Sequence, residues 1–145
     1  MTLRGLSLVA LRRRLSPGLP WFKGIYLARR LGEREKAEKI QDWQKTGANY
    51  AMNAPMLKAY NKPGEWNHTL IIVNKGHVEH WLNGKKVVEY EMWSDAWKKA
   101  KEEGKWKDHP GYGAAKQGYI AFQASHSNVQ NTGVCFKNIK IKVLK

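Results

Sequence analysis

Two side chains that can transfer protons, His126 and Glu65, lie in predicted loops. His126 comes after the apolar run GYIAFQ, in a segment rich in Ser and Asn, so its imidazole is a candidate acid, base or ligand. Glu65 precedes Trp66 after a Pro-Gly turn, where a carboxylate serves as a base or pairs with a lysine. For Glu65 structural pairing is the favoured interpretation, whereas a reactive and a merely solvated His126 are equally compatible with the sequence.

Three further side chains are candidates for holding a ligand. Gln123 ends an apolar segment, where its amide either binds a hydroxyl or completes the edge of a sheet. The Trp81 ring fills a core or stacks on a flat ligand such as a sugar, and the core is favoured. Asn83 forms an Asn-Gly pair with the next residue, which is the preferred two-residue hairpin turn.

Metal-ligand spacing is weak throughout the sequence. His68 and His80 face each other across a predicted hairpin, but no clear third ligand accompanies them. The single cysteine, Cys135, lies in the apolar stretch GVCFKNI, so we expect a packed thiol and no internal disulfide. No cofactor is indicated, and the sequence leaves a divalent metal as an open alternative.

Acidic residues recur at period two along the same hairpin. Glu79, Glu89 and Glu91 are predicted to share one solvent-facing side, with Lys85 and Lys86 as the neighbouring positive charges. This spacing does not single out the paired carboxylates of a hydrolase site.

The elements that position these residues are mostly strands. Residues 66–92 predict an antiparallel meander of three strands, and Ser94 and Gly104 predict the two ends of a short helix. Other predicted elements are a strand at 21–27, a short helix within 28–44, a strand and loop at 46–60, and strands at 118–125 and 134–144. About seven strands with turns between them favour an all-β sandwich with one or two short helices.

Length and charge limit the alternatives. A chain of 145 residues, 42% hydrophobic, fits one domain. The net charge of +14 permits binding to nucleic acid or anionic lipid but requires neither, and without a nucleic-acid motif a solvated basic surface is favoured. No apolar run reaches the length of a membrane span, and Arg12, Arg13 and Arg14 follow the short apolar patch near the N-terminus, which is the wrong order for an export signal.

Several motifs, in order, resemble the 3-keto-disaccharide hydrolase domain family, formerly a domain of unknown function. The matching stretches from residue 46 onward are TGANYAMNAP, KPGEWN, HVEHWLNGKKVVEYE, GKWKDHPGYGAAKQGYIAFQ and CFKNIKIKVL. Each stretch alone is weak evidence for this family, but all five in this order over about a hundred residues form a specific signal. The resemblance implies a concanavalin A-like jelly-roll β-sandwich, present here in part.

The resemblance also implies a carbohydrate ligand and cleavage of glycosides that carry a ketone at carbon 3. The ketone acidifies the hydrogen on carbon 2, so a base, a stabiliser for the ketone oxygen and an acid for the leaving group are required. Under this interpretation His126 and Glu65 are the expected catalytic residues, and Gln123, Trp81 and Asn83 bind substrate. A non-catalytic carbohydrate-binding module or an inactive fragment of the family is the first alternative, and nucleic-acid binding is the less favoured one.

The sequence departs from the family pattern at two places. We expect residues 1–20 to be a basic arm outside the fold and 21–145 to form a jelly-roll domain that lacks N-terminal strands. The family's Gln-Asp-His-Gly segment is replaced here by QASHSN, which keeps Gln123 and His126 but not the aspartate. Family members are usually exported, whereas this sequence shows no usable signal, so the compartment and the oligomeric state are left open.

Overall fold

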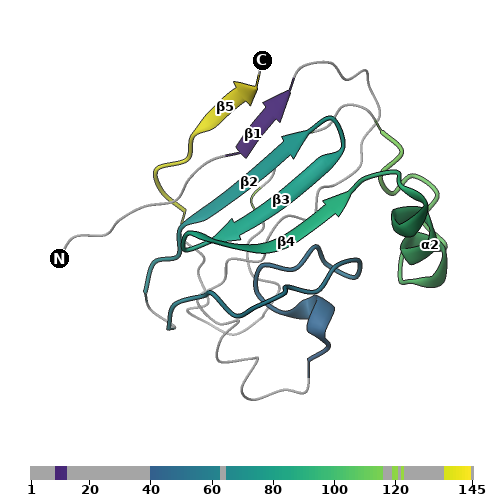
Figure 1. Ribbon diagram of the computed structural model, residues 1–145, viewed down its shortest axis with the longest axis horizontal. Helices are drawn as coiled ribbons and strands as arrows, with labels where there is room; N and C mark the ends of the chain where they lie inside the picture. Colours follow the sequence, from purple (N-terminus) through teal and green to yellow (C-terminus); the bar gives the residue numbers. More distant parts are fainter. Residues whose placement is uncertain are drawn as a thin grey trace.

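The structure, a computed structural model, consists mainly of one five-stranded sheet. It describes residues 9–12, 40–62, 65–115, 119–120, 122 and 136–144. The strands are β1 (Val9–Arg12), β2 (Thr69–Asn74), β3 (His77–Leu82), β4 (Lys85–Glu91) and β5 (Ile141–Leu144). Their order across the sheet is β4-β3-β2-β1-β5 (Figure 1). β3 is antiparallel to both β2 and β4, whereas β1 runs parallel to both β2 and β5.

The predicted meander is confirmed as β2, β3 and β4. Asn83 and Gly84 connect β3 to β4 with φ angles of 50° and 80°, which is the left-handed pair that such a hairpin turn requires. Lys75 and Gly76 make the equivalent turn between β2 and β3, with φ angles of 51° and 101°. Both turns contain two residues, so they fix the register of the three strands.

The small core lies on one face of the meander. Val78, His80 and Leu82 alternate inward along β3, as period two requires. In β4 the register shifts opposite His80 and Trp81, and the bulge turns consecutive Val87 and Val88 into the same core. The partly buried residues packed against this cluster are Ala59, Tyr60 and Tyr90.

The predicted helix is confirmed as α2 (Asp95–Glu103), which follows β4 (Figure 1). The Ser94 hydroxyl accepts a hydrogen bond from the backbone of Trp97, and Gly104 is the C-cap. Trp97 is the buried residue of this helix, and its ring stacks on that of Tyr112, which stacks in turn on Trp106. These rings attach the helix and the loop after it to each other.

Other predicted elements differ from the structure. Residues 46–60 form turns and an isolated bridge between Asn49 and Asn53 instead of a strand, because the backbone N–H groups of residues 48, 49, 52 and 53 bond to carbonyls three or four residues away. β1 lies inside the predicted basic arm of residues 1–20, and Val9–Arg12 pair on both sides with strands. The rest of that arm and the strand predicted at 21–27 lie outside the described residues.

Among the described residues the fold is all-β with one α-helix, and it represents part of a jelly roll. Of the two closing strands that the sequence predicts, β5 is present as Ile141–Leu144. Most of the other, at 118–125, lies outside the described residues. Within the part of the chain that the structure describes, no helix is both long and apolar enough to cross a membrane.

Candidate functional site

Two ring contacts bring distant parts of the chain together at one end of the sheet. The Lys137 Nζ atom lies 4.1 Å from the centroid of the Trp66 ring, and the rings of Phe122 and Phe136 have centroids 4.8 Å apart. Trp66 shortly precedes β2, and Phe136 and Lys137 shortly precede β5. Because β2 and β5 both run parallel to β1 between them, their N-terminal ends lie at the same edge of the sheet. We call Glu65, Trp66, Phe122, Phe136 and Lys137 the Trp66 site.

Lys137 is the unusual group of the Trp66 site. Its Nζ atom is covered from solvent, although the residue as a whole is half-buried, and it has no hydrogen-bond partner within the described structure. Desolvation lowers the pKa of the Lys137 ammonium below its ordinary value. The adjacent Glu65 is exposed, so its carboxylate is accessible to a ligand at this edge.

Asn83 stabilises the backbone at the same end of the sheet. Its Nδ2 atom donates to the Ala59 carbonyl and to Asn67 Oδ1, each at 2.8 Å, and its Oδ1 accepts from the backbone of His68 at 2.8 Å. These bonds join the hairpin turn to the segment before β2. The side chain that the sequence predicted to bind substrate therefore already has three internal partners.

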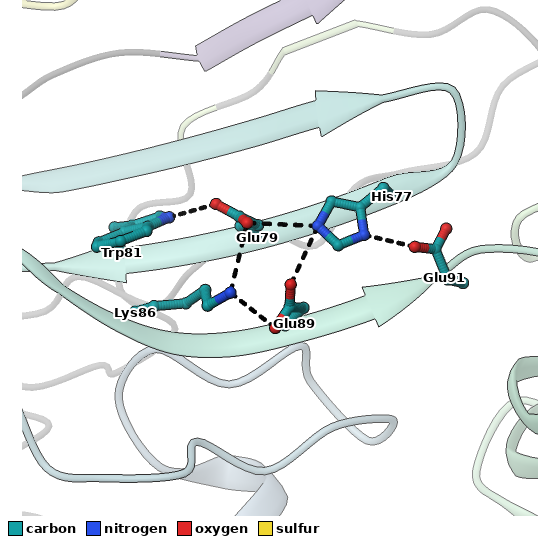
Figure 2. A network of polar contacts seen from close by, with 6 residues as sticks. All are labelled: His77, Glu79, Trp81, Lys86, Glu89 and Glu91. Atoms are coloured by element: carbon teal, nitrogen blue, oxygen red, sulfur yellow. Dashed lines mark hydrogen bonds and ion pairs between the residues drawn. The ribbon is translucent and has the colours of Figure 1, made fainter.

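Trp81 lies on the outward face of β3, opposite to the core face. Its indole N–H donates to Glu79 Oε2 at 2.6 Å, as Figure 2 shows, and the side chain is half-buried. The favoured interpretation of Trp81 as a core residue is therefore wrong: side chains alternate along β3, and Leu82 and His80 take the inward positions.

The outward face also carries a network of charged groups centred on His77 (Figure 2). His77 Nδ1 lies 2.5 Å from Glu91 Oε1, and its Nε2 lies 3.3 Å from Glu79 Oε1 and 3.2 Å from Glu89 Oε1. Lys86 Nζ lies 2.7 Å from Glu89 Oε2 and 3.5 Å from Glu79 Oε1. The three period-two glutamates do share one face, as predicted, and His77 joins Lys86 in balancing them.

The contacts of this network shift its pKa values in the directions that stabilise ion pairs. The hydrogen bond to Glu91, followed by that to Glu79, raises the pKa of His77. The N–H of Trp81 lowers the pKa of Glu79, and Glu89 raises that of Lys86. A protonated His77 donates from both ring nitrogens, which fits the carboxylate oxygens on either side of the ring.

Three side chains of the network could hold a metal ion. His77, Glu79 and Glu89 each offer a ligand atom, and these atoms lie within 4.8 Å of one another. A nitrogen and two carboxylates form a suitable donor set, but metal binding would require His77 to lose the proton that its neighbours stabilise. Three carboxylates face two cations when His77 is protonated, so most of the negative charge is already paired, and no metal role is assigned to the network.

His68 and His80, which the sequence suggested as a possible metal pair, differ in their burial. His80 is buried, its Nδ1 lies 3.0 Å from the Gly47 carbonyl, and its ring packs edge-on against Tyr90. A carbonyl only accepts hydrogen bonds, so Nδ1 carries the proton, and burial lowers the pKa of His80. His68 is exposed. His80 is therefore a neutral core residue.

The structure brings together only part of the site predicted from the sequence. Glu65 belongs to the Trp66 site, and Trp81 and Asn83 lie on and beside the end of β3. His126 and Gln123 lie outside the described residues, so their roles stay predictions. Sequence reasoning missed Lys137, because an isolated lysine in a basic chain carries no signal until its neighbours are known.

Comparison with known proteins identifies the family. A model of the 3-keto-alpha-glucoside-1,2-lyase-like domain matches residues 3–142. A 3-keto-disaccharide hydrolase of Bacteroides thetaiotaomicron is 32% identical over 101 residues, which cover 62% of this chain and 33% of that protein. The crystal structure of a candidate glycosyl hydrolase from Parabacteroides distasonis is similar with a TM-score of 0.52 and 47% identity, covering 55% of this chain and 36% of that one.

The matches differ in how much of each protein they cover. The chain spans about a third of the length of the curated relative and of the solved structure that it matches. The family model, in contrast, covers nearly the whole chain and begins well before the first motif that resembles the family. The chain therefore belongs to the family of 3-keto-alpha-glucoside-1,2-lyase-like domains.

Proposed function

We propose that the chain is a glycoside-cleaving domain that acts on 3-keto-disaccharides and related 3-keto-glycosides. The names of the family and of its relatives support this class of activity. The single structural observation in its favour is the convergence at the Trp66 site. Glu65 is adjacent to Trp66, which contacts Lys137, and Phe122, which directly precedes Gln123 in the sequence, contacts Phe136.

The proposed reaction is an elimination followed by addition of water. A base removes the proton from carbon 2, and the electron pair of that bond forms an enolate with the ketone at carbon 3. The enolate reforms the ketone as the bond between carbon 1 and the glycosidic oxygen breaks, and an acid protonates the departing oxygen. Water then adds across the new double bond between carbons 1 and 2, so the net change is hydrolysis.

The residues proposed for these steps are those that the sequence indicated. His126 and Glu65 are the proposed acid–base pair, because imidazole and carboxylate side chains are the usual general acids and bases of enzymes. Gln123 and Trp81 are the proposed contacts to sugar hydroxyls and to a sugar face. Asn83 is proposed to act through the turn that its three hydrogen bonds hold.

The test is release of reducing sugar from a 3-keto-disaccharide, with the unoxidised disaccharide as the control substrate. We expect His126→Ala and Glu65→Gln each to lower the rate by about a hundredfold or more, the usual effect of losing an acid or base. His109→Ala and Glu102→Gln are matched controls at exposed positions and should retain the rate.

Deuterium at carbon 2 distinguishes elimination from direct hydrolysis. Breaking that bond in the slow step predicts slower cleavage of the deuterated 3-keto-disaccharide, whereas direct displacement at carbon 1 predicts nearly equal rates. The Bacteroides thetaiotaomicron relative, tested in parallel, shows that the substrate is competent. Turnover by the relative and none by this chain would reject the proposal, and sugar binding without turnover would favour a binding module.

A further inference from the structure

The inner face of the sheet, which carries the small core, is well covered only toward β4. Strand pairing places Val88, His80 and Ile71 in one row across β4, β3 and β2, and β1 continues the row through Val9 to Ile141 in β5. Directly paired residues point to the same side of a sheet, so the row crosses one face. Val88 is 1% exposed and His80 5%, Ile71 is half-buried, and Ile141 at the far end is 57% exposed.

A second row across the sheet shows the same gradient of burial. Val78 in β3 is fully buried, and its partner Val73 in β2 is half-buried. β1 links Val73 through Leu11 to Val143 in β5, which is 54% exposed. We call the four aliphatic residues Ile71, Val73, Ile141 and Val143 the open inner face.

The covered half of this face owes its burial to residues 46–60. The Gly47 carbonyl accepts a hydrogen bond from His80 Nδ1, and Ala59 and Tyr60 pack against the core cluster on β3 and β4. A β-sandwich has two sheets packed face to face, whereas the described residues form a single sheet. The open inner face is therefore the part of the sheet to which a second layer can still be added.

Exposed apolar side chains of the described residues concentrate beside the open inner face. Phe122 contacts Phe136, which shortly precedes β5, so residues near Phe122 lie beside the start of this strand. Six of the nine large hydrophobic residues that are exposed belong to these two segments: Tyr119, Ile120, Phe122, Ile139, Ile141 and Val143. An apolar surface of this kind marks a site of interaction with another macromolecule.

The charge of the chain decides which partner fits this surface. Because each copy carries a net charge of +14, most contacts between two copies would oppose like charges. The open inner face is an exception, since its residues are aliphatic and Lys142, between Ile141 and Val143, points to the opposite side of β5. An acidic partner would fit that lysine-bearing side better than the aliphatic one.

We propose that the open inner face binds the same face of a second copy of this chain, forming a dimer with two-fold symmetry. In such a contact each copy uses the same patch, so Ile141 of one copy can pack on Val143 of the other and the reverse. The two sheets then form the two layers of a sandwich around the side chains of β2 and β5. This inference is independent of the proposed function, because the contact requires no substrate.

Sedimentation velocity of the whole chain tests the dimer, in about 0.3 M NaCl to screen the repulsion between copies. We expect a monomer–dimer equilibrium within about 1–200 µM, the range for an apolar contact of modest size. Ile141→Lys and Val143→Lys should each weaken the dimer about tenfold or more, because each places an unpaired ammonium in the contact. Met56→Lys makes a comparable exchange at an exposed residue bonded to β4, the opposite edge strand, and should leave the equilibrium unchanged.

A second experiment uses the wild-type chain alone, so it does not depend on a variant that folds. Isotope-filtered NMR of mixed labelled and unlabelled chains detects contacts between copies, and we expect them at the methyl groups of Ile141 and Val143. A chain that stays monomeric at about 200 µM would overturn the inference. So would a dimer whose contacts avoid these methyl groups, or one that Ile141→Lys and Val143→Lys leave as stable as the wild type.

Discussion

At the scale of single residues, the His77 network shows how one sheet face balances its charges. His77 lies between carboxylates from β3 and β4, and its pKa is raised from 6.5 chiefly by Glu91. Glu79 has its pKa lowered from 4.5, first by the Trp81 N–H. Both shifts mean that the folded state favours the charged form of each group, so each contributes stability only where that form is populated.

The signs define a pH window for this network. Because the His77 pKa is raised on folding, its contribution is complete below pH 6.5 and is lost as the pH rises through the folded value. Because the Glu79 pKa is lowered, its contribution is present above pH 4.5 and is lost as the pH falls through the folded value. The two contributions coexist between these limits.

An NMR titration tests the His77 part of this prediction. We expect the imidazole of His77 to titrate with a midpoint above 6.5 in the wild-type chain and to move toward 6.5 in Glu91→Gln, which removes the largest cause. Glu103→Gln, on the exposed side of α2, is the matched control and should leave the midpoint in place. A wild-type midpoint at or below 6.5 would contradict the network.

At the scale of elements, the stacked rings that attach α2 to its loop depend on one glycine. Gly113 has a φ of 70°, and a Cβ atom added there would lie 2.3 Å from Cη2 of Trp97. Its carbonyl also accepts a hydrogen bond from the Trp93 indole at 2.6 Å. The backbone thus passes closer to the Trp97 ring than any side chain allows.

We therefore expect Gly113→Ala to destabilise the chain by about 2–4 kcal/mol, since it combines overpacking with a strained φ. Gly111 lies in the same loop, has nothing within 4 Å of an added Cβ, and has no positive φ. Gly111→Ala should change stability by less than about 0.5 kcal/mol. Urea unfolding followed by tryptophan fluorescence measures both, and equal stability of the two variants would refute the close approach.

The elements that could be predicted from the sequence are those with local signals. The Asn83-Gly84 turn, the alternation along β3 and the Ser94 cap each depend on neighbours in sequence, and the structure confirms all three. β1 has no such signal, because only its pairing with two distant strands makes Val9–Arg12 a strand. Propensity alone favoured a strand within residues 46–60, where backbone bonds inside the loop prevail.

The candidate site was predictable to a similar extent. Glu65, Trp81 and Asn83 are marked by motif and turn, but the outward direction of Trp81 depends on which face of the sheet is covered. Lys137 and Trp66 are separated by most of the strands, so their contact follows from the sheet topology. No pattern in a single sequence contains that information.

At the scale of the whole molecule, the charge is unbalanced, with 26 Lys and Arg against 12 Asp and Glu. The ion pairs of the described residues involve a minority of these cations, and most are exposed and of little energetic value. Repulsion among the remaining positive charges therefore opposes compaction of the chain.

Salt should accordingly raise the thermal stability. At 0.5 M NaCl the screening length falls to a few ångströms, which removes more repulsion than attraction in a chain of net charge +14. We expect Tm to rise by several degrees between about 20 mM and 0.5 M NaCl, measured by scanning fluorimetry. Sorbitol at matched osmolality controls for general solvent effects, and a Tm that falls with NaCl would show that attractive pairs dominate.

The position of β1 also sets an order of events during synthesis on the ribosome. β1 is made first, yet its partners β2 and β5 appear only after many more residues have left the exit tunnel. The β2–β4 hairpins can form while translation continues, since their turns are short. Until β5 is made, one side of β1 exposes unpaired backbone groups, and that nascent edge is where chaperones would bind or chains would aggregate.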